Sequence, residues 1–255
     1  MAPLYRLPWQ KGLVRLQQRL LATIYPPQCL LCGAEGQLID GVAIDLCETC
    51  GQGLALNEQC CWRCAIPLPS PSEICGQCLK KPPPFDSLYA PFLYQDGIRE
   101  LLLTLKFNQK LSHARLLGAL LSEKLSNHVA QLDELPDAIV PVPLHSKRER
   151  QRGFNQALEL LRPVARRLQL DINHQLVMRG AATTKQTKLS ADERRRNLKG
   201  AFSVRKGVAV PRHLVIFDDV VTTTATVTEM AKTLKSAGAK RIDVWAVARV
   251  PKPIG

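Results

Sequence analysis

The chain has 255 residues, 45% of them hydrophobic, which is enough to bury a sizeable core and to form more than one domain. Its formal net charge of +13 favours anionic partners such as nucleic acid, phosphorylated metabolites or a membrane surface. Aromatic residues make up only 5%, which argues against a broad base-stacking platform, and the sequence has no apolar run of about 18 residues that would predict a transmembrane helix.

The N-terminal segment, residues 1–26, carries Lys11, Arg15 and Arg19 at helical spacing, with leucines on another face. The basic residues interrupt any continuous hydrophobic stretch, so the segment does not resemble a secretory signal, and we expect a cytoplasmic protein. We predict an N-terminal helix that packs against its own chain. The alternative is an amphipathic helix that contacts an anionic membrane surface.

Eight of the nine cysteines form four Cys-x2-Cys pairs within about fifty residues. Two such pairs can complete a tetrahedral sulfur site, so the pattern predicts two structural zinc ions. Sequential pairing gives one site from Cys29, Cys32, Cys47 and Cys50 and another from Cys61, Cys64, Cys75 and Cys78; an interleaved arrangement stays open. A disulfide framework is disfavoured by the odd cysteine count and the missing signal peptide, and iron–sulfur ligation is a lesser alternative. Cys60 is not expected to be a ligand.

A proline-rich stretch, residues 80–84, indicates a domain boundary. We therefore predict an N-terminal helix over 1–26, a double zinc-ribbon domain over 27–80 and an α/β domain over 85–255. In the last of these, residues 87–94 read as a strand or hairpin arm, Asp96-Gly97 as a turn, and residues 98–107 and 114–129 as helices. Lys106, near the end of the first helix, either faces a site or only complements the helix dipole.

An apolar strand is predicted over residues 137–144, followed by a basic segment and a helix that ends near Leu168. The basic loop, Lys147–Gly153, has four cations in its first six residues and could hold a pyrophosphate. A solvated basic loop is the alternative. Further on, the lid segment, Arg179–Phe202, is long and polar. It follows one short strand candidate, 174–178, and its last two residues begin another, 201–204. Loops of this kind commonly close over active sites, and Ser190 and Glu193 could form a helix capping box within it.

A second strand–loop–helix unit follows, with an apolar strand over 214–217 that ends at Asp218 and Asp219. The threonine loop, Thr222–Thr226, comes next, then a predicted helix over 227–237 and a final strand over 242–250. The loop can surround a phosphate with donors, and the two carboxylates can bind ribose hydroxyls or a divalent metal. The alternative is that both aspartates merely end a strand and a threonine caps the helix. Two such units in one parallel sheet would place both loops at its carboxyl edge.

Phe217-Asp-Asp-Val-Val-Thr-Thr-Thr-Ala-Thr226 resembles the ribose-phosphate signature of type I phosphoribosyltransferases, which bind phosphoribosyl pyrophosphate (PRPP) with magnesium. With Val142-Pro-Leu144, Arg152-Gly-Phe-Asn-Gln156 and the paired cysteines, the chain resembles the ComF/GntX family of bacterial DNA-uptake and DNA-utilisation proteins. The resemblance implies a type I phosphoribosyltransferase fold behind a double zinc ribbon. It assigns PRPP binding to Asp218, Asp219, Thr222, Thr223, Thr224, Ala225 and Thr226, with magnesium at the two aspartates. It assigns the pyrophosphate loop to Lys147, Arg148, Arg152 and Gly153, and a flexible loop to Arg179, Gln186, Arg194 and Asn197.

The resemblance also implies a role in the uptake or use of external DNA, with pentosyl transfer from PRPP to an unidentified acceptor. The alternative is a non-catalytic module that binds single-stranded DNA and keeps a regulatory or vestigial PRPP site; contact with DNA-uptake machinery stays open. One residue departs from the resembled pattern, because Thr224 stands where glycine is usual. A threonine at positive φ would store about 1–3 kcal/mol of strain. We therefore expect a retained but weakened phosphate site.

Overall fold

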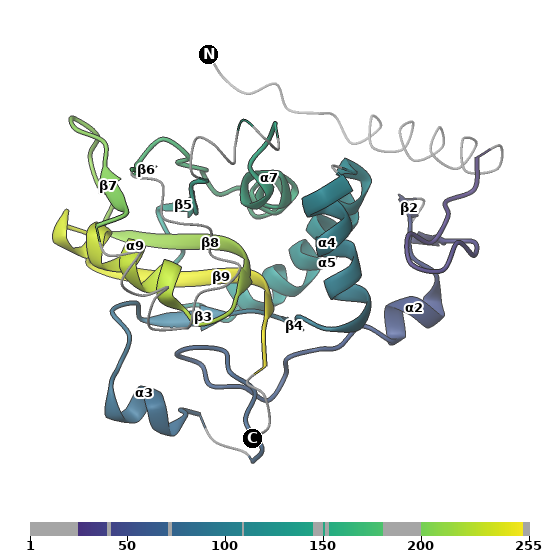
Figure 1. The fold of residues 1–255 in the computed structure, drawn as a ribbon, viewed down its shortest axis with the longest axis horizontal. Coiled ribbons are helices and arrows are strands. Elements are labelled where there is room, and N and C mark those ends of the chain that lie inside the picture. Colours follow the sequence, from purple (N-terminus) through teal and green to yellow (C-terminus); the bar gives the residue numbers. More distant parts are fainter. Residues whose placement is uncertain are drawn as a thin grey trace. The chain divides into compact units, whose positions relative to one another are not determined.

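The computed structural model describes residues 25–39, 42–70, 73–108, 110–144, 150, 153–180 and 200–251 (Figure 1). The chain divides into two compact units, Met1–Leu54 and Ala55–Gly255. Residues 1–24 of the predicted N-terminal helix lie outside the described residues. Within the described part of the chain, no helix is both long and apolar enough to cross a membrane.

The first unit contains a short antiparallel hairpin and one short helix. Strands β1 (Gln37–Ile39) and β2 (Val42–Ile44) pair with Leu38 opposite Ala43. Helix α2 (Glu48–Gln52) follows, with Cys47 at its N-cap position. These few exposed elements bury little apolar surface, so a metal is the natural source of their stability.

A parallel sheet forms the centre of the second unit, in the order β3-β9-β8-β5, with β4 also paired to β9. Its strands are β3 (Ser87–Tyr89), β4 (Phe92–Leu93), β5 (Ala138–Pro141), β8 (His213–Val221) and β9 (Arg241–Arg249). All of these pairs are parallel, which confirms the predicted α/β class. Residues 87–94 are therefore not a hairpin arm, because β3 and β4 run in one direction along β9 with Pro91 between them.

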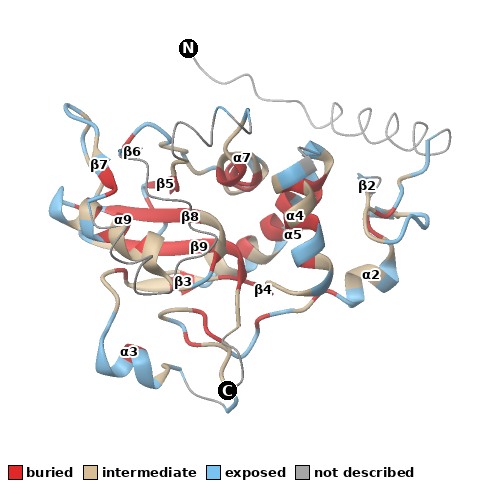
Figure 2. Cartoon of the chain, in the orientation of Figure 1, coloured by how far each residue is buried: buried red, intermediate tan, exposed pale blue. Residues whose placement is uncertain are grey.

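Helices cover both faces of the sheet. On one face, Leu214 and Ile216 of β8 pack in a cluster with Met230 and Leu234 of α9 (Ala225–Ser236). The intervening residues Val215 and Phe217 point to the other face, because side chains alternate along a strand. Both strand faces are thus buried, which explains the continuous apolar runs of β8 and β9 (Figure 2).

The other helices are α4 (Asp96–Asn108), α5 (Leu111–Val129) and α7 (Gln156–Leu168). The close approach of α5 and α7 depends on Gly118, since a Cβ there would lie only 2.3 Å from Pro163 Cγ. The turn predicted at Asp96-Gly97 is instead the first turn of α4.

The segment from Ala55 to Ile66 covers the outer edge of β3 and β4. Leu88 donates its backbone N–H to the Trp62 carbonyl over 3.0 Å, and Leu93 donates to Ala55 over 2.9 Å. Ala65 is fully buried in the same cluster as the sheet residues. The second group of cysteines and the short helix α3 (Gly76–Lys80) follow, so this ribbon is continuous with the packing of the sheet.

Strands β6 (Val177–Arg179) and β7 (Phe202–Val204) form an antiparallel pair at the two ends of the lid segment. This pairing brings Arg179 opposite Phe202. Residues 181–199 of the lid segment lie outside the described residues.

Candidate functional site

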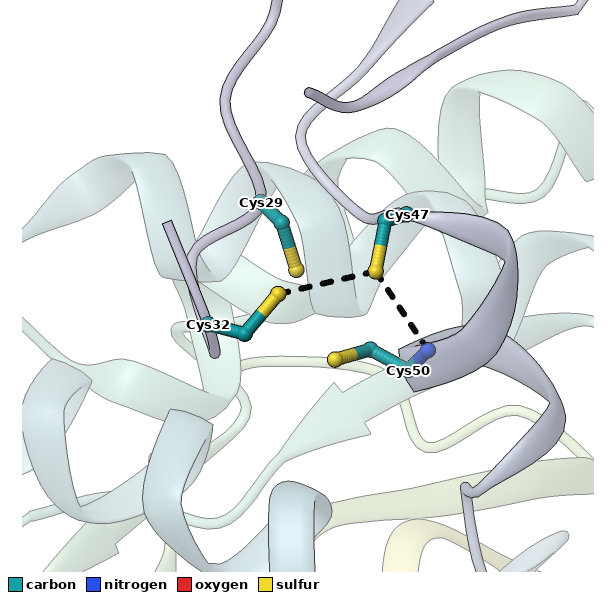
Figure 3. Close-up of side chains that lie close together, drawn as sticks. All are labelled: Cys29, Cys32, Cys47 and Cys50. Atoms are coloured by element: carbon teal, nitrogen blue, oxygen red, sulfur yellow. Dashed lines mark hydrogen bonds between the residues drawn. The ribbon is translucent and has the colours of Figure 1, made fainter. Parts of the chain in front are cut away.

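The cysteines form two separate clusters with sequential pairing. We call them the first ribbon cluster (Cys29, Cys32, Cys47 and Cys50; Figure 3) and the second ribbon cluster (Cys61, Cys64, Cys75 and Cys78). Within each cluster all four sulfur atoms lie within 4.8 Å of one another. The Cys32 and Cys47 sulfurs are 3.6 Å apart and those of Cys64 and Cys75 are 3.7 Å apart, too far for a disulfide. Tetrahedral zinc with Zn–S bonds of about 2.3 Å requires S···S separations of about 3.8 Å, so both clusters fit zinc.

Hydrogen bonding prepares one thiol of each cluster for ionisation. Burial opposes ionisation of Cys29, but hydrogen bonds from backbone N–H groups, including those of Cys47 and Cys32, lower its pKa to about 6. In the same way, burial is outweighed at Cys75 by a backbone N–H and by neighbouring thiols, which lower its pKa to about 7. Neighbouring thiols raise the pKa of Cys50, so metal binding is needed to ionise the complete set.

The ninth cysteine, Cys60, belongs to neither cluster. It is partly buried against the main core, and burial raises its pKa. Its environment is therefore that of a small apolar residue.

A second candidate site lies at the carboxyl edge of the sheet, where β5 and β8 end side by side. These strands are parallel neighbours, with Pro141 opposite Phe217, so the segments that follow each leave from the same edge. The apolar strand predicted over 214–217 is longer than expected, and β8 continues through Asp218 and Asp219 to Val221. The two carboxylates are thus held on ordered strand backbone.

Asp218 and Asp219 turn toward their own backbone and toward one cation. Asp219 donates its backbone N–H to Asp218 Oδ1 over 2.9 Å, and Val220 donates to Asp219 Oδ1 over 2.8 Å. Lys106 Nζ, from the last turn of α4, lies 3.6 Å from Asp219 Oδ2, so Lys106 faces the site as its position allowed. Burial, and then the adjacent Asp219 charge, raise the pKa of Asp218 well above its usual range, while Lys106 opposes the shift. Ionised together, the pair suits a divalent cation or the donating hydroxyls of a diol.

The threonine loop has the strained backbone that its sequence predicts. Thr224 is the N-cap of α9 and has φ 58° and ψ −2°, in the left-handed region that glycine adopts without cost. Its side chain makes no capping hydrogen bond to the first N–H groups of this twelve-residue helix, which are the groups that can bind an anion. Ala225 and Thr226 belong to the first turn of α9, which begins two residues earlier than predicted.

Within the basic loop, the structure describes only Arg150 and Gly153. Asn155 donates its side-chain N–H to the Val142 carbonyl over 3.1 Å, which ties the start of α7 to the residues after β5. Gly153 has φ 74°, a conformation that favours glycine. The predicted ligands Lys147, Arg148 and Arg152 lie outside the described residues.

Arg179 lies at the base of the lid segment. Its guanidinium is 5.4 Å from the centre of the Phe202 ring, a cation–π contact. Arg179, Asn155 and Arg205 line one cavity of about 380 Å³, so residues that flank the basic loop and the lid segment share that cavity. Gln186, Arg194 and Asn197 lie outside the described residues.

One contact at the threonine loop was not predicted from the sequence. Arg249, the last residue of β9, is buried and donates to the carbonyls of Val221 and Thr222. A lone arginine in the apolar strand predicted over 242–250 was the available signal, because a charge in a buried strand requires specific partners.

A family model and several solved structures are similar to parts of the chain. A model of the double zinc ribbon domain family matches residues 20–79, the region of both cysteine clusters. Among solved structures, a hypoxanthine phosphoribosyltransferase from Staphylococcus aureus is 12% identical, covering 55% of this chain and 75% of that chain at a TM-score of 0.36. A glutamine PRPP amidotransferase from B. subtilis is 16% identical, covering 51% and 25% at a TM-score of 0.34.

Similar curated proteins extend over most of the chain. The DNA utilization protein YhgH of Salmonella typhimurium is 40% identical over 205 residues, 80% of this chain and 90% of the relative. The YhgH protein of Escherichia coli (strain K12) is 38% identical over the same shares. Competence protein F of Haemophilus influenzae is 35% identical over 208 residues, again 80% and 90%. The chain therefore belongs to the ComF/GntX family, to which these DNA utilization and competence proteins belong.

Proposed function

We propose that this protein binds PRPP with magnesium at the carboxyl edge of its sheet and acts in the uptake or utilisation of external DNA. The observation that carries the PRPP proposal is the junction of β8 and α9. There the carboxylates of Asp218 and Asp219 stand directly before a loop that leads into an uncapped helix N-terminus. A ribose 5-phosphate offers the matching groups, a diol beside a phosphate.

The residues present fit a magnesium ion as well as a diol. Magnesium prefers carboxylate oxygens and usually binds one or two of them together with phosphate oxygens of the substrate. Asp218 and Asp219 supply such carboxylates, and burial together with the adjacent charge of Asp219 raises the pKa of Asp218 although Lys106 lies nearby. Bound magnesium would neutralise part of the negative charge on a departing pyrophosphate.

The chemistry proposed for this arrangement is displacement of pyrophosphate at the anomeric carbon of the ribose. The aspartates would hold the ribose, the threonine loop its 5-phosphate, and Lys147, Arg148 and Arg152 of the basic loop the pyrophosphate. The lid segment, with Gln186, Arg194 and Asn197, would cover the reacting atoms and exclude water. We propose that the chain retains this PRPP site, and we assign no acceptor.

Calorimetry with PRPP, with and without magnesium, tests the proposal. We expect magnesium-dependent binding at one site per chain, and we expect the double variant Asp218→Asn with Asp219→Asn to abolish it. A suitable control is Asp137→Asn, because Asp137 lies at the opposite end of the sheet, where its carboxylate accepts the backbone N–H of His213. Binding that survives the double variant, or that is absent from the zinc-loaded wild type, would refute the proposed site.

A second candidate function is single-stranded DNA binding, favoured by the net charge of +13 and by the names of the relatives. In this case the PRPP site would be regulatory or vestigial, and the basic loop and lid segment would contact phosphates. The two candidates separate in one titration of DNA with and without PRPP. If PRPP weakens or strengthens DNA binding, the two sites are linked. If the protein binds DNA and does not respond to PRPP, the second candidate is favoured.

A further inference from the structure

Arg249 joins the second ribbon cluster to the threonine loop within the second unit. Its Nε donates to the Cys64 carbonyl over 2.9 Å, and Cys64 is one of the cluster's four ligands. Its Nη1 donates to the carbonyls of Val221 over 3.0 Å and of Val250 over 2.8 Å, and also to the Thr222 carbonyl. One side chain therefore contacts both the backbone of a metal-binding turn and the first residue of the threonine loop.

The charge of Arg249 also points to the second ribbon cluster. The residue is only 5% exposed, and none of the ion pairs within the described residues includes it. Four thiolates around one zinc ion leave a net negative centre, so a loaded cluster would compensate the buried guanidinium.

The geometry suits arginine and not lysine. A guanidinium presents several donors in a rigid plane and can bond carbonyls of separate segments at once, whereas an ammonium is a compact, strongly hydrated charge. Without Arg249, the carbonyls of Val221 and Thr222 would lose a buried donor just before Thr224, whose backbone is already strained. The loop would then be free to relax away from its observed shape.

We propose that Arg249 is a positioning residue that couples metal loading of the second ribbon cluster to the shape of the threonine loop. This inference rests on the proposed function, because PRPP is the ligand whose binding would report the loop's shape. Loss of zinc from the second ribbon cluster weakens PRPP binding, whereas loss from the first leaves it unchanged. Coupling is reciprocal for binding free energies, so PRPP in turn strengthens zinc binding at the second cluster only.

The experiment uses the full zinc-loaded chain and the variants Arg249→Met and Arg249→Lys. The matched control is Arg241→Met, which removes an arginine from the other end of the same strand, where its Nε contacts Asp243. Zinc release from the second cluster is followed with a chromophoric chelator in a Cys29→Ser background, with and without magnesium-PRPP. Hydrogen exchange of the amides of residues 220–228 reports the loop directly, without any ligand.

In the Cys29→Ser chain we expect PRPP to strengthen zinc binding, measured by competition with the chelator, by a factor of about 5 or more, the lower end of usual coupling. Arg249→Met should abolish this effect, weaken PRPP binding about tenfold and speed exchange of the loop amides, with Arg249→Lys in between and Arg241→Met unchanged. Zinc removal from the wild type should speed loop exchange in the same way. If Arg249→Met does not fold, Arg249→Lys and the wild-type zinc comparison decide the matter.

Two outcomes distinguish this inference from the proposed function. If PRPP binds normally, but zinc loading does not change the hydrogen exchange of the loop and Arg249→Met changes neither, the coupling alone is overturned. If hydrogen exchange of the loop depends on zinc loading and on Arg249, but the protein does not bind PRPP, the coupling is supported and PRPP is refuted as the ligand.

Discussion

Lys106 Nζ lies 3.6 Å from Asp219 Oδ2, so a helix from one part of the second unit supplies a cation to the acidic pair at the end of β8. The pKa of Asp218 responds to this contact, because Lys106 lowers it while burial and Asp219 raise it. Magnesium-PRPP needs the ionised pair, so affinity should rise with pH as Asp218 ionises. Lys106→Met should move the midpoint of this pH dependence to higher pH. Asp219→Asn should move the ionisation of Asp218 to lower pH. Calorimetry across a pH series, with carboxyl titration by NMR, measures both, and a profile that Lys106→Met leaves in place would contradict this assignment.

The same carboxyl links stability to pH in the unliganded protein. Folding raises the pKa of Asp218, so its contribution to stability is complete below the pKa of the unfolded chain and is lost as pH rises through the folded pKa. Asp218→Asn removes that loss. We expect this variant to be more stable than wild type at pH values above the folded pKa of Asp218, to differ little at acidic pH, and to bind PRPP at least about tenfold more weakly. Denaturant unfolding at the two pH values checks the sign; a variant that is less stable at the higher pH would refute it.

Thr224 offers a test of strain at the ligand loop. Its φ of 58° suits glycine, so Thr224→Gly should stabilise the fold by about 1 kcal/mol, the released strain less the entropy that glycine costs. PRPP should bind up to about tenfold more tightly, because the unstrained loop keeps its ligand-ready shape more of the time. Thr223→Gly is the control, since Thr223 does not have positive φ and should lose stability. Weaker PRPP binding by Thr224→Gly would mean that the Thr224 hydroxyl matters more than the strain.

The cysteine clusters predict two zinc ions per chain by elemental analysis of protein purified without added metal. Cys29→Ser should remove one zinc and the fold of the first unit only. Cys61→Ser should remove the other zinc and lower the melting temperature of the sheet, because Cys61 is buried in the second unit. Circular dichroism with zinc analysis separates the two variants. Metal-free protein of unchanged stability would contradict a structural role for zinc.

For the DNA-binding candidate, retention of single-stranded DNA should fall steeply with salt, because basic residues release counterions from the phosphates. Charge reversal at Arg194, Arg195 and Arg196 of the lid segment should weaken binding about tenfold or more and reduce the salt slope. Retention that ignores both changes would exclude the lid segment as a contact.

The sequence predicted the features that depend on local pattern. The continuous apolar runs predicted the buried parallel strands, and the Cys-x2-Cys pairs predicted the thiol clusters, although only the structure selected sequential pairing. The positive φ of Thr224 followed from the glycine it replaces. What local pattern could not supply was long-range: the contact of Lys106 with Asp219, and the route of Arg249 to Cys64, 185 residues away in the chain. Such contacts depend on how whole elements pack.

The covering of β3 and β4 by the segment around Trp62 protects the protein against aggregation. The Leu88–Trp62 and Leu93–Ala55 hydrogen bonds occupy donors on a strand edge that would otherwise be open to another chain. If the second ribbon cluster lost its metal and the segment from Ala55 to Ile66 dissociated from β3 and β4, that edge would become a template for strand addition between molecules. Zinc starvation would then cause this protein to aggregate before the sheet itself unfolds. A fragment that begins at Phe85 would expose the same strand edge as soon as it is synthesised.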